Sequence, residues 1–276
     1  MGGGVAAAYQ APPASTEFLE VGGIRLRVSI EGRGRPLLLL NGIGAAFELL
    51  EPFRRALEAV ETIALDMPGT GGSKAMRLPH RLGTFADVAA RALDLLGYGE
   101  VDVLGVSWGG VLAQEFARRH AARVRRLMLA ATTHGSFSVP GDPSALWALM
   151  TPRRYYSPSY FEQIAPVLYG GAARTNPRLL REHGHLRFIR PPNFRGYFYQ
   201  LLAISGWTSL PWLHRIDQPA LVLAADDDPI IPLVNARMLA RRLPNARLHV
   251  VRDGGHLFLL THAAEVAPVV ERFLED

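Results

Sequence analysis

Cysteine is absent from this chain of 276 residues, and lysine occurs only once, as Lys74. Without a thiol, the chain cannot form a disulfide framework, a thiolate nucleophile or a thiolate metal site. The net charge of +5 therefore comes almost wholly from arginine, which is spread along the sequence. We interpret it as a solvated arginine-rich surface. The alternative is a patch that faces an anionic partner, and nucleic-acid binding has only the net charge in its favour.

Long apolar runs are also missing, since none reaches the roughly 18 residues that a membrane-spanning helix needs. The amino-terminal residues lack the basic region of a signal peptide, and the first basic residue is Arg25. Met1-Gly2 does not continue into the myristoylation pattern, because position 6 is Ala. We therefore expect a soluble cytoplasmic protein in which residues 1–16 form a disordered tail.

Residues 16–32 alternate apolar and polar side chains around Gly22-Gly23, a pattern that predicts an antiparallel hairpin. Short apolar runs follow, most of them separated by stretches with helical periodicity. The predicted buried strands are PLLLLN, VETIALD, VDVLGV, VRRLMLA, ALVLAA and ARLHVV. Buried strands that alternate with helices indicate the α/β class, with a mostly parallel sheet covered by helices on both faces.

One interval breaks this alternation, because roughly 80 residues between VRRLMLA and ALVLAA hold no convincing buried strand. The interval is rich in aromatic residues, proline and arginine. We predict that residues 134–215 form a mostly helical cap over the carboxyl edge of the sheet, inserted between core residues 17–133 and 216–276. The cap holds more aromatic surface than its own small core needs, so part of that surface is expected to face a cleft or the outside.

Gly105-Val106-Ser107-Trp108-Gly109 fits the pattern G-x-S-x-G, in which a sharp turn from strand to helix exposes a nucleophilic serine. Gly105 and Gly109 are expected there because a Cβ atom would collide within the tight turn. The bare pattern is a weak signal, but here it lies between a predicted strand and a predicted helix. We predict that Ser107 is a nucleophile, and the alternative is a structural serine with a hydrogen-bonded hydroxyl.

A serine hydroxyl needs a base to take its proton, and a histidine acts as that base when a carboxylate holds the right tautomer. Where this turn occurs, the order along the chain is serine, acid, histidine, which excludes His80 and disfavours His134. His256, in RDGGHLFLL, follows a predicted strand and stands on a glycine loop. His256 is therefore the predicted base.

The orienting acid is expected in LVLAADDDPIIP, where three consecutive aspartates follow a strand. Such a cluster of like charges is costly unless each member has its own role. Asp228 is the preferred acid, whereas Asp226 and Asp227 could cap a helix or face water. Asp66 and Asp253 compete weakly, because turn or cap formation explains them.

A tetrahedral intermediate also needs hydrogen-bond donors for its negative oxygen. One predicted donor is the backbone N–H of Trp108, which follows the serine. The second is the N–H of Ile43 in the loop LLLLNGIG, where Gly42 and Gly44 suit a close approach. The alternative for this loop is an ordinary glycine turn.

These motifs in this order, together with DMPGTGGS, resemble the α/β-hydrolase superfamily over nearly the whole chain. The closer similarity is to the intracellular depolymerases of medium-chain-length poly(3-hydroxyalkanoates), which share phrases close to NGIGA, GVSWGG, TPRRYY, YGGA, GWTS, WLH, DDDP and DGGHLFL. The resemblance implies the α/β-hydrolase fold, and it places Ser107, Asp228 and His256 at the positions of the family's catalytic triad.

Two positions depart from the resemblance. Asn41-Gly42 stands where a His-Gly pair is usual, which leaves a backbone donor unaffected. Ala225 stands where hydrolases commonly have glycine, which leaves the choice among the three aspartates open.

The resemblance implies a serine hydrolase that cleaves the ester bonds of 3-hydroxyacyl polyesters through an acyl-enzyme, without a metal or an organic cofactor. The apolar cap would bind the alkyl side chains of the polyester, and its outer face could rest on a storage granule. One alternative is a soluble carboxylesterase that acts on small acyl esters with the same triad. An alternative of another class is a non-hydrolytic lyase or a ligand receptor on the same fold.

Overall fold

Eight strands form one mixed sheet in the computed structural model, which describes residues 15–176, 178 and 184–276. Their order across the sheet is β1-β2-β4-β3-β5-β6-β7-β8. β1 pairs with β2 and β2 with β4 in antiparallel fashion, and the other neighbours are parallel. The strands are β1 (Ser15–Val21), β2 (Ile24–Glu31), β3 (Arg35–Leu40), β4 (Val60–Asp66), β5 (Val101–Val106), β6 (Val124–Ala130), β7 (Ala220–Ala225) and β8 (Ala246–Val251).

The amino-terminal hairpin forms as the sequence predicted, with Val21 paired to Ile24. Gly22 and Gly23 join its strands at φ angles of 58° and 80°, a region that glycine enters without steric cost. The six predicted buried strands are β3 to β8. The predicted α/β fold, with a mostly parallel sheet and an antiparallel hairpin, is therefore confirmed.

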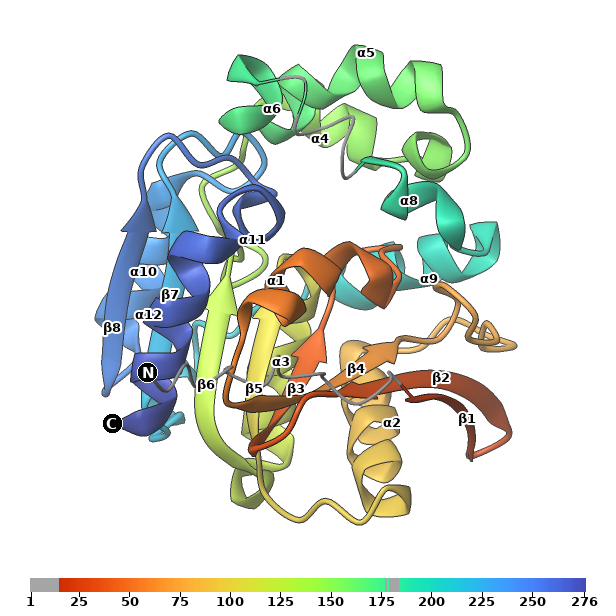
Figure 1. Ribbon diagram of the computed structural model, residues 1–276, viewed down its shortest axis with the longest axis vertical. Coiled ribbons are helices and arrows are strands. Elements are labelled where there is room, and N and C mark those ends of the chain that lie inside the picture. Colours follow the sequence, from red (N-terminus) through yellow and green to blue (C-terminus); the bar gives the residue numbers. More distant parts are fainter. Residues whose placement is uncertain (1–14, 177, 179–183) are drawn as a thin grey trace, which may run out of the picture.

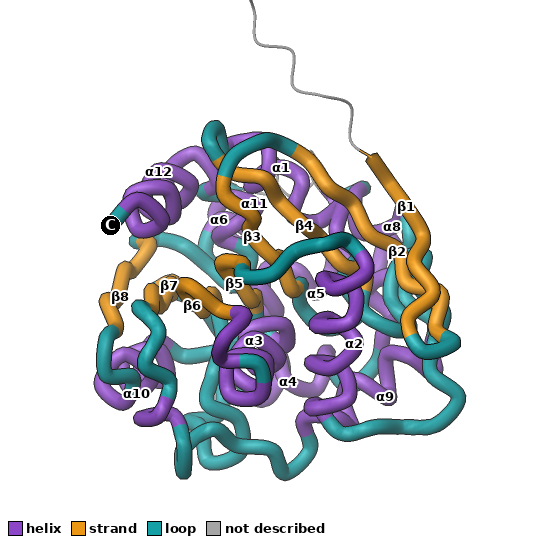
Figure 2. Tube along the Cα trace, turned by 90° about the horizontal axis from the view of Figure 1, so that it is seen from below, coloured by secondary structure: helices purple, strands orange, loops and turns teal. Residues whose placement is uncertain are grey.

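Helices cover both faces of the sheet because each inner strand is apolar on both sides. In β3, Leu38 and Leu40 pack into one core cluster and Leu37 and Leu39 into the other. Figure 2 shows the sheet between α1 and α12 on one side and α2, α3 and α10 on the other. These helices are α1 (Glu51–Ala56), α2 (Leu82–Leu95), α3 (Trp108–Arg119), α10 (Leu233–Arg242), α11 (Phe258–Thr261) and α12 (Ala263–Glu275), with short 3-10 turns η1 (Phe47–Leu50) and η2 (Ala121–Arg123).

The segment between β6 and β7 is helical and lies above the carboxyl ends of the strands (Figure 1). We call residues 134–215 the cap segment. Its fully described helices are α4 (Pro143–Leu149), α5 (Pro158–Tyr169), α6 (Ala172–Thr175), α8 (Leu186–Ile189) and α9 (Phe194–Ile204), with 3-10 turns η3 (Pro152–Tyr155) and η4 (Leu213–Arg215). β6 and β7 are hydrogen-bonded neighbours although the cap segment separates them in the sequence.

The predicted tail, residues 1–16, lies outside the described residues except for Ser15 and Thr16, with which β1 begins. In the part of the chain that the structure describes, every helix is too short or too polar to cross a membrane.

Candidate active site

Ser107 lies in the turn between β5 and α3, where the chain leaves the carboxyl edge of the sheet. Its φ of 54° and ψ of −117° are strained for a residue with a side chain, as is typical of a functional turn. A Cβ atom on Gly105 would lie 2.2 Å from the Gly109 oxygen, and one on Gly109 would lie 2.0 Å from the Leu40 oxygen. The two glycines therefore let α3 start directly against the strands.

Ser107 faces His256, which reaches it from the loop after β8. Ser107 Oγ lies 3.0 Å from His256 Nε2, and His256 Nδ1 lies 2.7 Å from Asp228 Oδ2. Asp228 Oδ1 accepts hydrogen bonds from the backbone N–H groups of Ile230 and Ile231, each at 2.9 Å. The carboxylate thus favours the tautomer with a proton on Nδ1, which leaves Nε2 able to accept the serine proton.

The glycine loop before His256 allows a close approach to the cap segment. A Cβ atom on Gly255 would lie 2.0 Å from the backbone carbonyl oxygen of Tyr169. That oxygen accepts a hydrogen bond of 2.7 Å from the His256 N–H, and the Tyr169 ring stacks on the imidazole at 6.5 Å between centroids. Tyr169 therefore fixes both the backbone and the ring of His256.

The three consecutive aspartates have different surroundings. Asp227 Oδ2 accepts a hydrogen bond of 2.7 Å from the Gly171 N–H, and Asp227 Oδ1 lies 3.4 Å from Arg174 Nη2. Asp226 is exposed to solvent. Asp228 is the member of the three that contacts a histidine, so it is the one placed to orient His256.

The weaker competitors lie in structural positions. His134 is fully buried with Nδ1 3.5 Å from Ser138 Oγ, and burial lowers the pKa of this histidine. Asp66 is buried and accepts a hydrogen bond of 3.0 Å from Arg27. Asp253 is exposed in a turn with a φ of 55°. The hydrogen bonds of these three residues include none to Ser107. Asp66 and Asp253 thus have the structural role that was their simpler interpretation, and His134 is not the base.

Two backbone donors lie beside the serine. The N–H groups of Ile43 and Trp108 make no hydrogen bond within the part of the chain that is described. Trp108 is the first residue of α3, so its N–H has no intrahelical partner. A Cβ atom on Gly42 would lie 3.6 Å from Ser107 Cβ, which shows how closely this loop approaches the serine. Unpaired N–H groups in this position can stabilise a negative oxygen.

The loop that carries Ile43 is held by three side chains, two of them from the cap segment. Its bonds are Asn41 Nδ2 to Ala46 O (2.9 Å), Gly42 N to Asn41 Oδ1 (2.8 Å), Tyr155 Oη to Ile43 O (2.7 Å) and Gly44 N to Gln200 Oε1 (2.9 Å). Gln200 also accepts a hydrogen bond of 2.9 Å from Trp108 Nε1 through its backbone oxygen. Tyr155 and Gln200 thus couple the cap segment to both candidate donors.

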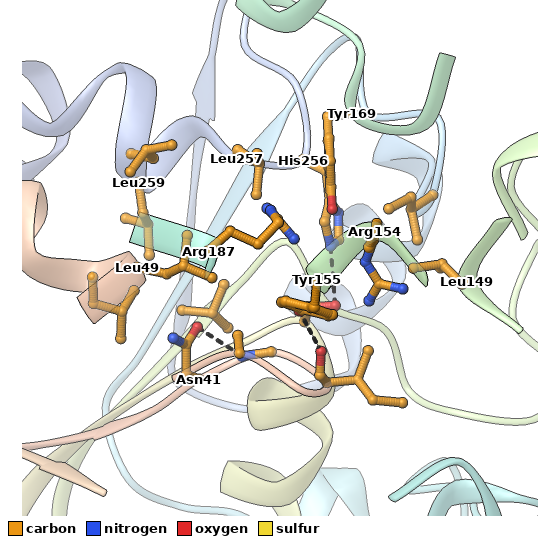
Figure 3. A pocket seen from close by; sticks show the side chains of 18 residues that line it. Asn41, Leu49, Leu149, Arg154, Tyr155, Tyr169, Arg187, His256, Leu257 and Leu259 are labelled. Carbon is orange, nitrogen blue, oxygen red and sulfur yellow. Dashed lines mark hydrogen bonds between the residues drawn. The ribbon is translucent and has the colours of Figure 1, made fainter. Parts of the chain in front are cut away.

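A cavity of about 70 Å³ opens beside Ser107 and His256 (Figure 3). Much of its wall is aliphatic, as expected for a site that binds an apolar group. These aliphatic side chains include Leu49, Leu149, Ile230, Leu257, Leu259 and Leu260. The wall also contains two arginines, Arg154 and Arg187, which are 2% and 3% exposed.

The surroundings of Arg154 keep its guanidinium charged. Burial alone would lower the pKa, but the phenol groups of Tyr155, Tyr169 and Tyr197 outweigh it, so the pKa of Arg154 is raised. Arg154 Nη1 donates to Tyr197 Oη at 2.7 Å and to Thr151 O at 3.1 Å.

The sequence did not identify Arg154, Tyr155, Tyr169, Arg187 or Gln200 as residues of the site. The segment TPRRYY contains Arg154 and Tyr155, but its resemblance to a phrase of the depolymerases assigned no role to either residue. Each of these residues lies in the cap segment, far along the chain from Ser107, and no spacing pattern predicts which cap side chains point inward.

The chain matches the alpha/beta hydrolase fold family over residues 35–263. It is 52% identical over 242 residues to a poly(3-hydroxyalkanoate) depolymerase from Ectopseudomonas oleovorans, a match that covers 87% of this chain and 84% of the relative. It is 29% identical over 285 residues to a 2-hydroxymuconate semialdehyde hydrolase from Pseudomonas putida, covering 98% and 97% of the two chains. The crystal structure of the enol-lactonase from Burkholderia xenovorans LB400 has a TM-score of 0.81 at 22% identity, covering 94% of this chain and all of the other. This last likeness concerns the fold alone.

Proposed function

Because the chain belongs to the alpha/beta hydrolase fold family, we propose that it is a serine hydrolase that cleaves the ester bonds of poly(3-hydroxyalkanoates). The observation that carries the chemistry is the unbroken series of contacts from Ser107 through His256 to Asp228. The homology to the depolymerase from Ectopseudomonas oleovorans supports the substrate class.

In the first half of the reaction, Ser107 Oγ attacks the ester carbonyl carbon while His256 Nε2 takes the serine proton. The N–H groups of Ile43 and Trp108 bind the oxygen that becomes negative. When the intermediate collapses, the ester C–O bond breaks and His256 returns the proton to the leaving alkoxide. The leaving part of the chain departs with a free 3-hydroxyl group, and the remainder is an acyl ester of Ser107.

In the second half, water attacks the acyl-enzyme and His256 accepts one of its protons. The same N–H groups stabilise the second tetrahedral intermediate, which releases a carboxylic acid and restores the Ser107 hydroxyl. Asp228 holds the imidazole in place and stabilises its protonated form in both halves.

The aliphatic wall of the cavity suits the alkyl side chain of a 3-hydroxyacyl unit. A volume of about 70 Å³ is nevertheless smaller than a cavity of about 150 Å³ that holds benzene. We therefore expect the wall to move outward when a side chain of medium length enters. Since every buried methylene contributes about 0.8 kcal/mol, longer side chains favour the widened state.

Apolar side chains on the outside of the cap segment support contact with a polymer surface. The most exposed large apolar residues of the described chain are Phe137 and Trp147, at 83% and 80%. Other exposed apolar residues of the cap segment include Met150, Phe194, Phe198 and Leu202. A cytoplasmic protein would gain free energy by burying this surface on a storage granule.

A carboxylesterase for small acyl esters is the second candidate, and the small cavity is the observation that favours it. A short acyl group would fit without any movement of the wall. The two candidates share the same triad, so only the substrate separates them.

The test compares medium-chain amorphous polyester granules with granules of poly(3-hydroxybutyrate), and p-nitrophenyl octanoate with the acetate. Released acids are quantified by chromatography. We expect acid from medium-chain granules and a kcat/KM for the octanoate that is roughly 10- to 50-fold higher. Equal rates on both nitrophenyl esters, with no acid from medium-chain granules, would favour the small-ester carboxylesterase.

Ser107→Ala tests the mechanism in the same assays and should leave roughly 10⁻⁴ to 10⁻⁶ of the activity with the fold intact. Ser205→Ala, at an exposed position in the cap segment, is the matched control and should keep full activity. A tenth of the activity remaining in Ser107→Ala would show that another residue is the nucleophile.

A further inference from the structure

Arg154 and Arg187 are buried cations without an anionic partner. Neither forms an ion pair with a carboxylate in the described part of the chain. The other two buried arginines each have a carboxylate partner. Arg27 lies 3.0 Å from Asp66, and Arg54 lies 3.5 Å from Glu31. The fold therefore pairs buried arginines with carboxylates elsewhere and leaves these two unpaired at the cavity.

The two guanidinium groups share one patch of the cavity wall. Their Cζ atoms lie 4.6 Å (Arg154) and 5.0 Å (Arg187) from the centroid of the Tyr155 ring. Arg187 makes no hydrogen bond in the described structure, and the Nε atom of each arginine lacks a partner. Figure 3 shows both side chains among those that line the cavity.

A buried guanidinium is costly unless an anion pairs with it. The aromatic rings around Arg187 compensate only part of this cost, because a ring face is a weaker partner than a carboxylate. A guanidinium presents a planar fork that matches the two oxygens of a carboxylate. An anion that enters with the substrate would supply the partner that the protein itself does not provide.

A poly(3-hydroxyalkanoate) chain carries one negative group, the carboxylate at its end. This carboxylate lies in the leaving part of the chain, because the acyl part ends in a hydroxyl group. The proton for the leaving alkoxide comes from His256, so the leaving part lies on the His256 side of the site. Tyr169 stacks on His256, and Arg187 Cζ lies 5.0 Å from the Tyr169 centroid. Arg187 is thus separated from His256 by one aromatic ring, and Arg154 lies beside Arg187 at the Tyr155 ring.

Building on the proposed function, we propose that Arg154 and Arg187 form a carboxylate subsite for the leaving part of the substrate. The subsite selects ester bonds close to a free carboxyl end and releases short 3-hydroxy acids from that end. Arg187, which has no other polar partner, contributes more to the binding than Arg154, which also holds Tyr197.

The test uses two dimers that have one ester bond each and differ in the charge of their end group: 3-hydroxyoctanoyl-3-hydroxyoctanoate as the free acid and as its primary amide. We expect the kcat/KM of the free acid to be about 10- to 100-fold higher in the wild-type protein. Arg187→Met should bring this ratio close to one, and Arg187→Lys should keep part of it. The ratio is taken within each variant, so a general loss of activity cancels. Arg153→Met, at the exposed arginine next to Arg154, is the control and should keep the wild-type ratio.

A second measurement does not depend on turnover. Calorimetric titration of 3-hydroxyoctanoate and of the neutral 3-hydroxyoctanamide into the Ser107→Ala protein should show tighter binding of the acid. Hydrolysis of both dimers at equal rates, or equal binding of acid and amide, would overturn the carboxylate subsite and leave the proposed function standing. Binding of the acid in preference to the amide, without hydrolysis of either dimer or of granules, would support the subsite and refute the depolymerase.

Discussion

The three adjacent aspartates at positions 226 to 228 have different partners in the structure. Asp228 contacts His256, Asp227 contacts the Gly171 N–H of the cap segment, and Asp226 faces solvent. Three neighbouring carboxylates repel one another, and the hydrogen bonds to two of them offset that repulsion. The sequence could not distinguish these roles, because they depend on which partner each side chain meets after folding.

These differences predict unequal effects of three conservative substitutions. Asp228→Asn should lower kcat on p-nitrophenyl octanoate by roughly 10⁴-fold, because an amide presents a donor to His256 Nδ1 and stabilises the wrong tautomer. Asp227→Asn keeps an oxygen for the Gly171 N–H and should cost a few-fold at most, and Asp226→Asn should be close to wild type. Steady-state kinetics on the three purified variants measure these losses. A large loss of kcat in Asp227→Asn, with normal activity in Asp228→Asn, would show that Asp227 is the acid that orients His256.

At the scale of single elements, α9 connects the cap segment to the two candidate oxyanion donors. Gln200 lies in this helix, and its side chain accepts the Gly44 N–H while its backbone oxygen accepts Trp108 Nε1–H. A Cβ atom on Gly196 would lie 2.4 Å from the Gly69 Cα, so α9 also packs directly on the loop after β4. The position of the Ile43 N–H therefore depends on α9.

Replacing Gln200 tests this connection. Gln200→Leu leaves the buried Gly44 N–H without a partner, so the loop that carries Ile43 should shift and one oxyanion donor should weaken. We expect kcat to fall roughly 10- to 100-fold with little change in KM, measured on p-nitrophenyl octanoate. Arg195→Ala, at an exposed position of α9, serves as the control. A rise in KM with normal kcat would mean that Gln200 acts on substrate binding instead.

Secondary-structure elements could be predicted from the sequence wherever a local sequence pattern determines them. The apolar runs predicted β3 to β8, and Gly22-Gly23 predicted the hairpin. One of the stretches with helical periodicity covers residues 47–60, which contain η1, the short helix α1 and the first residue of β4 rather than one continuous helix. Pro52 lacks an N–H and lies in the first turn of α1, so a continuous helix through it would lose a hydrogen bond. The five cap residues of the site were not predictable, because their contacts join distant parts of the chain.

At the scale of the whole molecule, the cap segment is attached to the core on two sides. On one side Tyr169 O accepts the His256 N–H, and on the other α9 bonds to Gly44 and Trp108. Between these attachments, α8 carries Arg187 into the cavity wall and is only four residues long. A single helical turn has little cooperative stability of its own. We therefore predict that α8, whose Leu186 packs in one apolar cluster with Ala45 and Leu49 of the core, is the part of the wall that yields when a long side chain enters.

Hydrogen exchange followed by mass spectrometry tests this view. Backbone amides of α8 should exchange faster than those of α9, because α9 has eleven residues and is hydrogen-bonded to the core. An octyl phosphonate bound covalently to Ser107 should change exchange in α8 and leave the central strands unchanged. Slower exchange in α8 than in α9, with no response to the phosphonate, would place the movement elsewhere.

The cap segment starts shortly after the end of β6 and finishes shortly before the start of β7, and these two strands are hydrogen-bonded neighbours. When the anchor points of an insertion lie side by side, its entropic cost grows only with the logarithm of its length. The sheet therefore imposes no particular length or sequence on what lies between them. Ser107, Asp228 and His256 all lie outside residues 134–215. Recombination of one continuous stretch of gene can thus exchange the whole cap segment while the codons of Ser107, Asp228 and His256 are inherited unchanged, as long as the new segment again supplies the contacts that Tyr155, Tyr169 and Gln200 make to the core.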